Sequence, residues 1–229
     1  MAIEDPLREF PAEAPRDCAR CARLLAYRKA NRSAEPAWYN GAVASFGPAS
    51  ARLLIVGLAP GRKGANRTGR PFTGDFAGEL LYQTLLALGF ARGAYGANPQ
   101  DGLLLLDCMI TNAVRCVPPD NKPTPAECHA CRPYLASRIG ALPRLAAILA
   151  LGRIAHDSTL AALTLRKSLF PFAHGARHAV RSDLALFDSF HCSRYNTNTG
   201  KLTPAMFRAV LEAVKTHLEE GRGSRGKLR

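Results

Sequence analysis

The chain contains no stretch close to the roughly 20 consecutive apolar residues that a membrane-spanning helix needs. Its longest apolar run, Leu145 to Leu151, has the length of a buried strand. Residues 1–15 carry acids and prolines in place of a basic segment followed by an apolar core. We therefore expect a cytoplasmic protein with neither a secretion signal nor a membrane partner. Internal repeats and heptad runs are also absent, which argues against repeat architectures.

Acidic residues are scarce, with 18 Asp and Glu against 31 Lys and Arg, and the formal net charge is +13. Such a charge favours a polyanionic partner, for which nucleic acid is the commonest choice and a membrane surface the alternative. The 229 residues, 47% of them hydrophobic, suffice for one well-buried domain, which we assign to residues 1–220. Residues 221–229 are rich in Gly, Ser, Lys and Arg and predict a disordered basic tail.

Strand and helix patterns alternate along the chain, which predicts an α/β fold with a parallel sheet between helices. The expected strands cover residues 52–56, 103–110, 145–150 and 184–187, and the expected helices cover residues 18–32, 75–88, 125–141, 153–163 and 203–219.

A long glycine-rich loop, from Gly57 to Gly78, follows the first expected strand. Open α/β sheets bind ligands beyond the carboxyl ends of their strands, and glycines let the backbone approach a ligand closely. The loop also carries Phe72, Asp75 and several cationic side chains, a combination suited to a planar ligand attached to an anion. It contains neither G-x-x-x-x-G-K-[ST] nor G-x-G-x-x-G, which disfavours a nucleotide-binding enzyme.

Two further polar residues stand at the ends of expected strands. Asn112 offers one acceptor and two donors, which suits reading the edge of a base, although it could be an ordinary turn residue. His191 could donate a hydrogen bond to charge that develops on a substrate, or it could only satisfy nearby backbone. We assign structural roles to the remaining histidines: His129, His156, His174, His178 and His217.

Seven cysteines are present, and four of them form two spaced pairs, Cys18 with Cys21 and Cys116 with Cys131. Spaced thiols in a chain without a secretion signal more often bind metal or act in redox chemistry than form disulfides. All-thiolate ligation suits zinc or an iron-sulfur cluster, and the spacing does not decide between them. Cys128 lies one helical turn from Cys131 and could replace it as a ligand.

Several ordered motifs together carry a resemblance. They are GLAPG, NRTGRPFTGD, ITNAVRC followed by PP and N, C-R-P-Y-L around Cys131, and H-x-S-x-x-N-x-x-T-G from His191. The chain resembles uracil-DNA glycosylases with an iron-sulfur cluster, and most closely the type B enzymes of family 5. The resemblance implies a three-layer α/β/α sandwich on a four-stranded parallel sheet. It also implies a [4Fe-4S] cluster held by Cys18, Cys21, Cys116 and Cys131. Cys128 is then not expected to be a ligand.

The same resemblance implies roles in removing uracil, and other deaminated bases such as hypoxanthine and xanthine, from DNA. Phe72 would stack on the flipped base and Asn112 would read its edge. His191 would stabilise the departing base, and Asp75 would stabilise the sugar cation or position water. Asp75 also has an ordinary alternative role as a helix cap. The backbone that would border the base comprises Gly57, Leu58 and Ala59.

DNA contacts are expected around the same loops. The residues assigned to DNA are Arg62, Lys63, Arg67, Ser193, Arg194 and Thr199. Arg194 or Tyr195 would fill the gap left by the flipped base. Asn121 is a weaker candidate for the site, whereas Asp120 is expected to be a turn residue. We expect the protein to be a monomer.

Two departures from the superfamily pattern stand out. Leu58 and Ala59 occupy positions where many relatives have Asp or Glu, and Cys192 stands where proline is commoner. The alternative function is an iron-sulfur or zinc protein that binds nucleic acid without cutting it.

Overall fold

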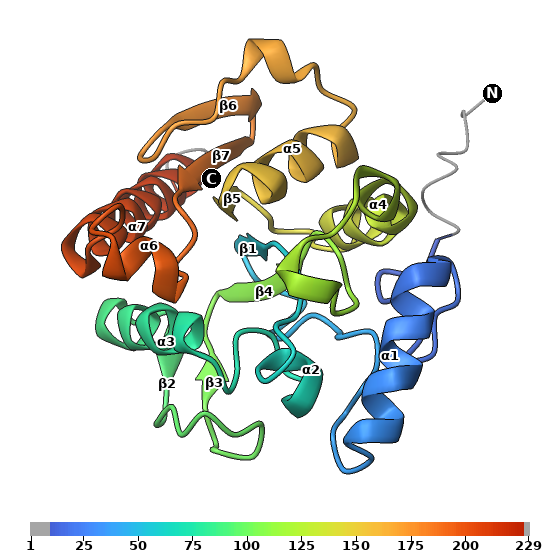
Figure 1. Cartoon of the computed structure of the whole chain (residues 1–229). Helices are drawn as coiled ribbons and strands as arrows, with labels where there is room; N and C mark the ends of the chain where they lie inside the picture. Colours follow the sequence, from blue (N-terminus) through green and yellow to red (C-terminus); the bar gives the residue numbers. More distant parts are fainter. Residues whose placement is uncertain (1–9, 227–229) are drawn as a thin grey trace.

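A five-stranded sheet forms the centre of the computed structural model, which describes residues 10–226 (Figure 1). The strands lie in the order β4 (Cys108–Asn112), β1 (Leu53–Gly57), β5 (Ala147–Leu151), β7 (Leu184–Ser189) and β6 (Arg177–Arg181). The first four are parallel, as expected, but β6 pairs antiparallel with β7. The prediction of a four-stranded sheet was therefore wrong by one edge strand.

Helices cover both faces of this sheet. On one face lie α3 (Phe76–Leu88) and α7 (Pro204–Gly226), and on the other lie α4 (Pro125–Gly140) and α5 (Arg153–Ala162).

The residues of β1 show why both faces are covered. Leu53 and Ile55 pack into the core with α3 and α7, whereas Leu54 and Val56 pack with α4 and α5. All five residues of the strand are buried, as its uninterrupted apolar sequence predicts for a parallel strand. The expected three-layer α/β/α sandwich is confirmed.

One expected strand is split in two. Within residues 103–110, β3 (Leu104–Leu105) pairs antiparallel with β2 (Ala91–Arg92), and β4 begins only at Cys108. Asp107 separates the two pieces because its backbone adopts a left-handed conformation with φ of 56°. The Asp107 carboxylate accepts a hydrogen bond of 2.7 Å from Arg52 Nε, which fixes this turn against the start of β1.

The helix boundaries differ from expectation at both ends of the chain. Helix α1 (Ala22–Ala34) begins after Cys21, which is its N-cap, so Cys18 precedes the helix. Helix α7 continues to Gly226, so residues 221–226 are not the irregular tail that we expected, and the rest of that tail lies outside the described residues. Within residues 10–226, none of the helices has the length and apolar character of a membrane span.

The short elements gather at the carboxyl edge of the sheet. They are α2 (Ala65–Thr68) in the glycine-rich loop, a 3-10 turn η1 (Pro119–Asn121) after β4, and α6 (Arg194–Asn198) after β7. A second 3-10 turn, η2 (Lys167–Leu169), follows α5.

Candidate active site

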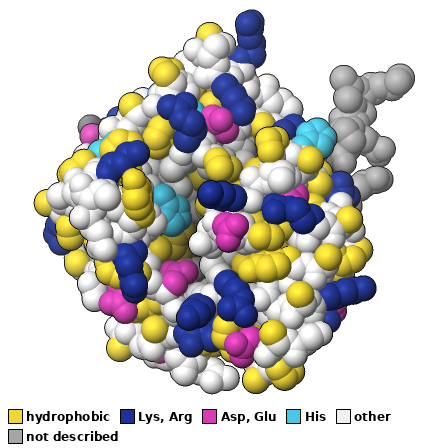
Figure 2. Space-filling view, in the orientation of Figure 1, with side chains coloured by type: hydrophobic (Ala, Val, Ile, Leu, Met, Phe, Trp, Pro, Cys, Tyr) yellow, Lys and Arg dark blue, Asp and Glu magenta, His cyan; other side chains and the backbone are white. Residues whose placement is uncertain are grey.

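A cavity of about 690 Å³ opens at the carboxyl edge of the sheet, where the loops after β1, β4 and β7 meet. This is the edge at which open α/β sheets bind ligands. Figure 2 shows a hollow on this face, with a histidine side chain in its wall and Lys and Arg side chains around it. The residues assigned from the sequence that line the cavity are Leu58, Ala59, Arg62, Lys63, Phe72, Asp75, Asn112, His191, Ser193 and Arg194.

Gly57 lies behind the cavity wall and leaves room for two of the lining side chains. A Cβ atom at this position would stand 2.4 Å from Asn112 Oδ1 and 2.6 Å from the ring of Phe72. Both distances are far shorter than ordinary contacts, so only glycine lets Phe72 and Asn112 approach β1. We expected the Gly57 backbone to border the base, but the residue does not itself line the cavity, and what it provides is room for these two side chains.

The ring of Phe72 forms one wall. It lies roughly parallel to the imidazole of His191, with an interplanar angle of 27° and a centroid distance of 5.8 Å. The Phe72 backbone has φ of 52°, in the left-handed region that a bulky residue rarely adopts. Such a conformation persists only where the surrounding structure imposes it.

The residues before Phe72 provide that restraint. The Arg70 guanidinium is buried and binds both carboxylate oxygens of Asp101, at 2.8 and 2.7 Å. The Tyr82 hydroxyl donates to the Pro71 carbonyl at 2.6 Å. Since these contacts hold the backbone on the N-terminal side of Phe72, the ring is fixed in its position without a ligand.

Asn112 carries an unused hydrogen-bonding group. It is the last residue of β4, beside Gly57 in the parallel register, and only 3% of its surface is exposed. Its Oδ1 atom is buried and has no hydrogen-bond partner among the described residues. Because an unpaired buried acceptor costs about 1–3 kcal/mol, this atom is suited to receive a donor from a bound ligand.

Asp75 combines a capping role with a position in the cavity wall. It is the N-cap of α3, and its Oδ1 accepts from the Gly78 backbone N–H at 3.3 Å. Its Oδ2 lies so close to Gly64 that a Cβ atom there would stand 2.2 Å away. Burial raises the pKa of Asp75, and hydrogen bonds from the Gly78 and Ala77 backbone only partly oppose this. The capping role that the sequence left open is thus observed, and the same carboxylate also lines the cavity.

His191 follows β7 and faces Phe72 from the opposite wall. Burial lowers its pKa to about 4, so the imidazole is neutral at physiological pH and can donate one hydrogen bond. The Asn196 side-chain amide donates to the His191 carbonyl at 2.8 Å and fixes the turn. Cys192, in the place where proline is commoner, is fully buried, and its thiol donates to the Ala77 carbonyl of α3 at 3.4 Å.

The expected DNA-contact residues divide into two groups. Arg62 and Arg194 line the cavity, with their guanidiniums 5.4 Å from the Trp38 ring centroid and 5.3 Å from that of Phe76. Arg67 and Thr199 do not line it.

The two side chains outside the cavity bond to nearby backbone. Arg67 bonds the Gly74 carbonyl at 3.4 Å, and the Thr199 hydroxyl donates to the Tyr195 carbonyl at 2.8 Å. Asn121 does line the cavity, whereas its neighbour Asp120 does not. The backbone of Asn121 is left-handed, with φ of 57°, a conformation that asparagine tolerates. The sequence alone did not predict this conformation.

Four thiols surround a second, smaller cavity between the start of α1, the segment after β4 and α4. Cys18, Cys21, Cys116 and Cys131 all line it, whereas Cys128 lines a different surface pocket beside α5. All seven cysteines are free of disulfides, and burial raises the pKa of the Cys131 thiol to about 11. The two sequence pairs are thus brought together, and Cys128 is left out of the set.

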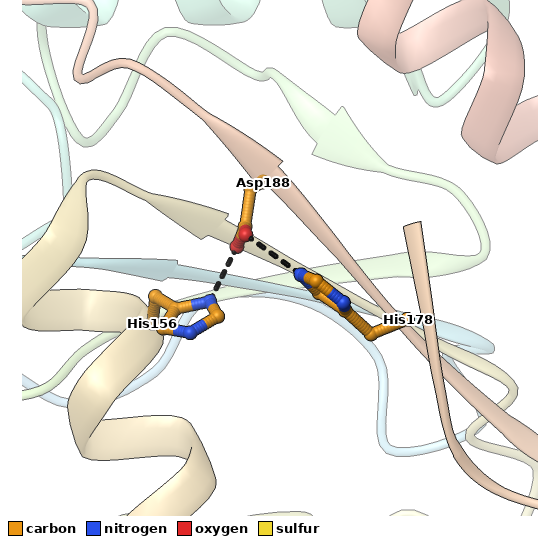
Figure 3. A group of neighbouring side chains, drawn as sticks. All are labelled: His156, His178 and Asp188. Atoms are coloured by element: carbon orange, nitrogen blue, oxygen red, sulfur yellow. Dashed lines mark hydrogen bonds and ion pairs between the residues drawn. The ribbon is translucent and has the colours of Figure 1, made fainter. Parts of the chain in front are cut away.

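A separate cluster beneath β7 joins His156, His178 and Asp188, whose potential ligand atoms lie within 4.8 Å of one another (Figure 3). His156 Nδ1 lies 2.7 Å from one Asp188 oxygen, and its Nε2 lies 2.9 Å from the Phe170 carbonyl. Both ring nitrogens face acceptor oxygens, an arrangement that favours the protonated imidazole over a metal ligand. Burial lowers the pKa of His156, but the hydrogen bond and charge of Asp188 outweigh it and raise the value. The cluster is an ion pair that ties α5 to β7.

Comparisons with known proteins agree with this geometry. The model of the uracil DNA glycosylase superfamily matches residues 44–215. The type-5 uracil-DNA glycosylase of Thermus thermophilus is 45% identical over 86% of this chain and 92% of its own length. The type-5 enzyme of Pyrobaculum aerophilum is 35% identical over 85% of this chain and 86% of its own length. A type-4 enzyme of the latter organism is 39% identical over 61% of this chain. The chain therefore belongs to the uracil DNA glycosylase superfamily, whose members hydrolyse N-glycosidic bonds, and within it to the type-5 uracil-DNA glycosylases.

Proposed function

We propose that the protein excises uracil from DNA and leaves an abasic site. The observation that carries this proposal is the unpaired Oδ1 atom of Asn112 beside the ring of Phe72. Uracil is planar and presents an N–H donor between two carbonyl oxygens on its pairing edge. A buried amide with a free acceptor, next to an aromatic ring, suits such a base once it has left the duplex.

Two lining side chains carry the chemistry in this proposal. As the glycosidic bond breaks, positive charge develops on the sugar and negative charge on the base. Neutral His191 donates a hydrogen bond to the base, an interaction worth roughly 3 kcal/mol per well-placed donor. The Asp75 carboxylate stabilises the sugar cation and orients the water whose oxygen bonds to C1′ of the sugar. Its raised pKa suits it to accept a proton from that water.

The shape of the cavity supports activity on larger deaminated bases as well. Its volume of about 690 Å³ exceeds what a single pyrimidine needs, and Leu58 and Ala59 present no polar group to a base. Without a carboxylate at these positions, hypoxanthine and xanthine meet neither repulsion nor a clash there. We propose that the enzyme accepts these purines in addition to uracil.

The cavity rim supplies contacts for the DNA backbone. Arg62, Lys63 and Arg194 bring positive charge to the rim, and Ser193 brings a hydroxyl. Tyr195 follows Arg194 on α6 and is 74% exposed, the highest value among the large hydrophobic residues described as exposed. We assign Tyr195 the place between the base pairs that the flipped nucleotide vacates.

The thiol cavity fits an iron-sulfur cluster. Four cysteines and no carboxylate line it, which is the donor set of [4Fe-4S] proteins. A single tetrahedral zinc ion would bring its sulfur ligands within about 3.8 Å of one another. Among the described residues, the only group of three or more ligand atoms within 4.8 Å is the His-Asp cluster, so the four sulfurs are spaced more widely. When bound, the cluster would supply four iron-thiolate bonds that tie α1 and α4 to the segment after β4.

The test is incubation of the protein with duplex and single-stranded oligonucleotides that carry uracil, hypoxanthine or xanthine, followed by alkali to reveal abasic sites. We expect Asp75→Asn and His191→Ala to lose turnover while retaining affinity for DNA. Asp75→Asn is preferred to Asp75→Ala because its amide oxygen still caps α3. DNA binding without abasic sites in the wild-type protein would instead support the non-catalytic alternative. Iron analysis of anaerobically purified protein tests the cluster separately.

A further inference from the structure

Two arginine side chains beside the thiol cavity are almost completely buried. Arg28 is 2% exposed and Arg115 is 1% exposed, and they head the largest fully buried side chains of the described residues. Guanidinium groups are rarely buried unless opposite charge and hydrogen bonds compensate for the loss of water.

Arg28, from α1, has mainly neutral partners. It donates from Nη1 to the Arg16 carbonyl at 2.6 Å and from Nη2 to the Cys18 carbonyl. The nearest carboxylate, on Asp17, is 4.0 Å away and 67% exposed. The Nε–H of Arg28 is buried and has no partner among the described residues. Arg28 thus brings a positive charge that is only weakly paired to the peptide segment that carries the first thiol.

Arg115 is better paired, since its guanidinium also donates to the Ser45 hydroxyl at 2.9 Å and to the Ala12 carbonyl at 3.4 Å. Its Nη1 donates to a Glu13 oxygen at 2.9 Å, but Glu13 also binds Arg138 at 2.6 Å, so one carboxylate serves two guanidiniums. The Nε–H of Arg115 is likewise buried without a partner among the described residues.

Each arginine contacts a residue that carries one of the thiols. Arg115 lines the thiol cavity, and its backbone N–H donates to Cys131 Sγ at 3.3 Å. Arg28 donates from Nη2 to the backbone carbonyl of Cys18, which lines the same cavity. The site therefore holds positive charge and two orphaned N–H donors, one on Arg115, which lines the cavity, and one on Arg28, which bonds to the Cys18 backbone. A [4Fe-4S] core with four thiolates has the opposite character, since it carries about two negative charges and exposes sulfur acceptors.

We propose that Arg28 and Arg115 bind the iron-sulfur cluster through N–H···S hydrogen bonds from Nε and neutralise its net negative charge. This inference rests on the proposed cluster. Hydrogen bonds and positive charge favour the more negative, reduced state of such a centre. The two arginines therefore retain the cluster and also raise its reduction potential.

The experiment measures iron per chain, the rate of cluster loss to an iron chelator, and the midpoint potential by spectroelectrochemistry. The variants are Arg28→Gln, Arg115→Gln and the corresponding lysine substitutions. Loss of an outer partner of a metal site typically costs about 10-fold or more in affinity, so we expect cluster loss at least that much faster in the glutamine variants, with a more negative potential. Lysine keeps the charge but lacks the Nε–H, and its effect should be intermediate.

Arg20→Gln is the matched control. Arg20 also lines the thiol cavity, but it is exposed and its Nε already donates to the Ala130 carbonyl at 3.0 Å. It should behave as wild type in all three measurements. If the glutamine variants do not fold, the lysine variants decide, and unchanged loss rates and potentials in them would overturn the inference. A wild-type protein that contains no iron would overturn the proposed cluster and this inference together.

Discussion

Gly57→Ala offers a direct test of the base pocket. The Gly57 backbone does not have the positive φ that disfavours alanine, so the only penalty of the substitution is lack of space. The new Cβ atom would stand 2.4 Å from Asn112 Oδ1 and 2.6 Å from the Phe72 ring. One or both side chains must move by about 1 Å, and a displacement of that size at a catalytic site costs on the order of 100-fold in rate.

We expect kcat/KM for a uracil-containing oligonucleotide to fall by about 100-fold, equivalent to about 2.7 kcal/mol in transition-state stabilisation. Affinity for undamaged DNA should be unchanged, because the cavity rim is intact. The control is Gly140→Ala at the end of α4, where an added Cβ would meet nothing within 4 Å. If Gly57→Ala keeps kcat/KM within about threefold of wild type while unfolding cooperatively, Phe72 and Asn112 do not hold the base as argued.

Three further outcomes can be checked. Burial lowers the pKa of His191 to about 4, so kcat/KM should show no histidine inflection near pH 6.5, and an inflection there that vanishes in His191→Gln would contradict this. Asp101→Asn leaves the buried Arg70 guanidinium without its carboxylate, and urea titration should show a loss of about 3 kcal/mol in the free energy of unfolding; a loss below about 0.5 kcal/mol would refute the pairing. Asp188 raises the pKa of His156 in the folded state. The His156–Asp188 interaction therefore stabilises the fold fully below about pH 6.5, and this stabilisation is lost as pH rises through the pKa of His156 in the folded protein. Urea titrations from pH 6 to 9 should follow that decline in the wild type and not in His156→Gln.

The sequence was sufficient to predict the parallel strands and the residues that follow them. Asn112 and His191 were found because parallel strands end at one edge of a sheet, and the structure brings both to one cavity. The strand β6 was missed because its sequence, Arg-His-Ala-Val-Arg, has only one buried residue and is polar as an edge strand should be.

Side-chain direction was harder to foresee than backbone position. Arg67 and Thr199 have the chemistry for phosphate contacts, but they do not line the cavity and each bonds to nearby backbone. Asn121 reaches the cavity only because a left-handed backbone turns it inward, which no periodic pattern records. Secondary-structure propensity and residue spacing locate helices and strands, but the hydrogen-bond partner of each polar atom depends on the assembled fold.

The fixed ring of Phe72 has a consequence for how damage is recognised. The backbone strain at this residue is met during folding by the Arg70, Asp101 and Tyr82 contacts, so in the proposed function the arriving base would find a surface that is already in place. Ordering this segment would then add little entropic cost to capture. The selective step is then the flipping of the nucleotide out of the DNA duplex, which costs least free energy for weakly paired bases. A mispaired uracil would thus be selected largely by the instability of its own base pair.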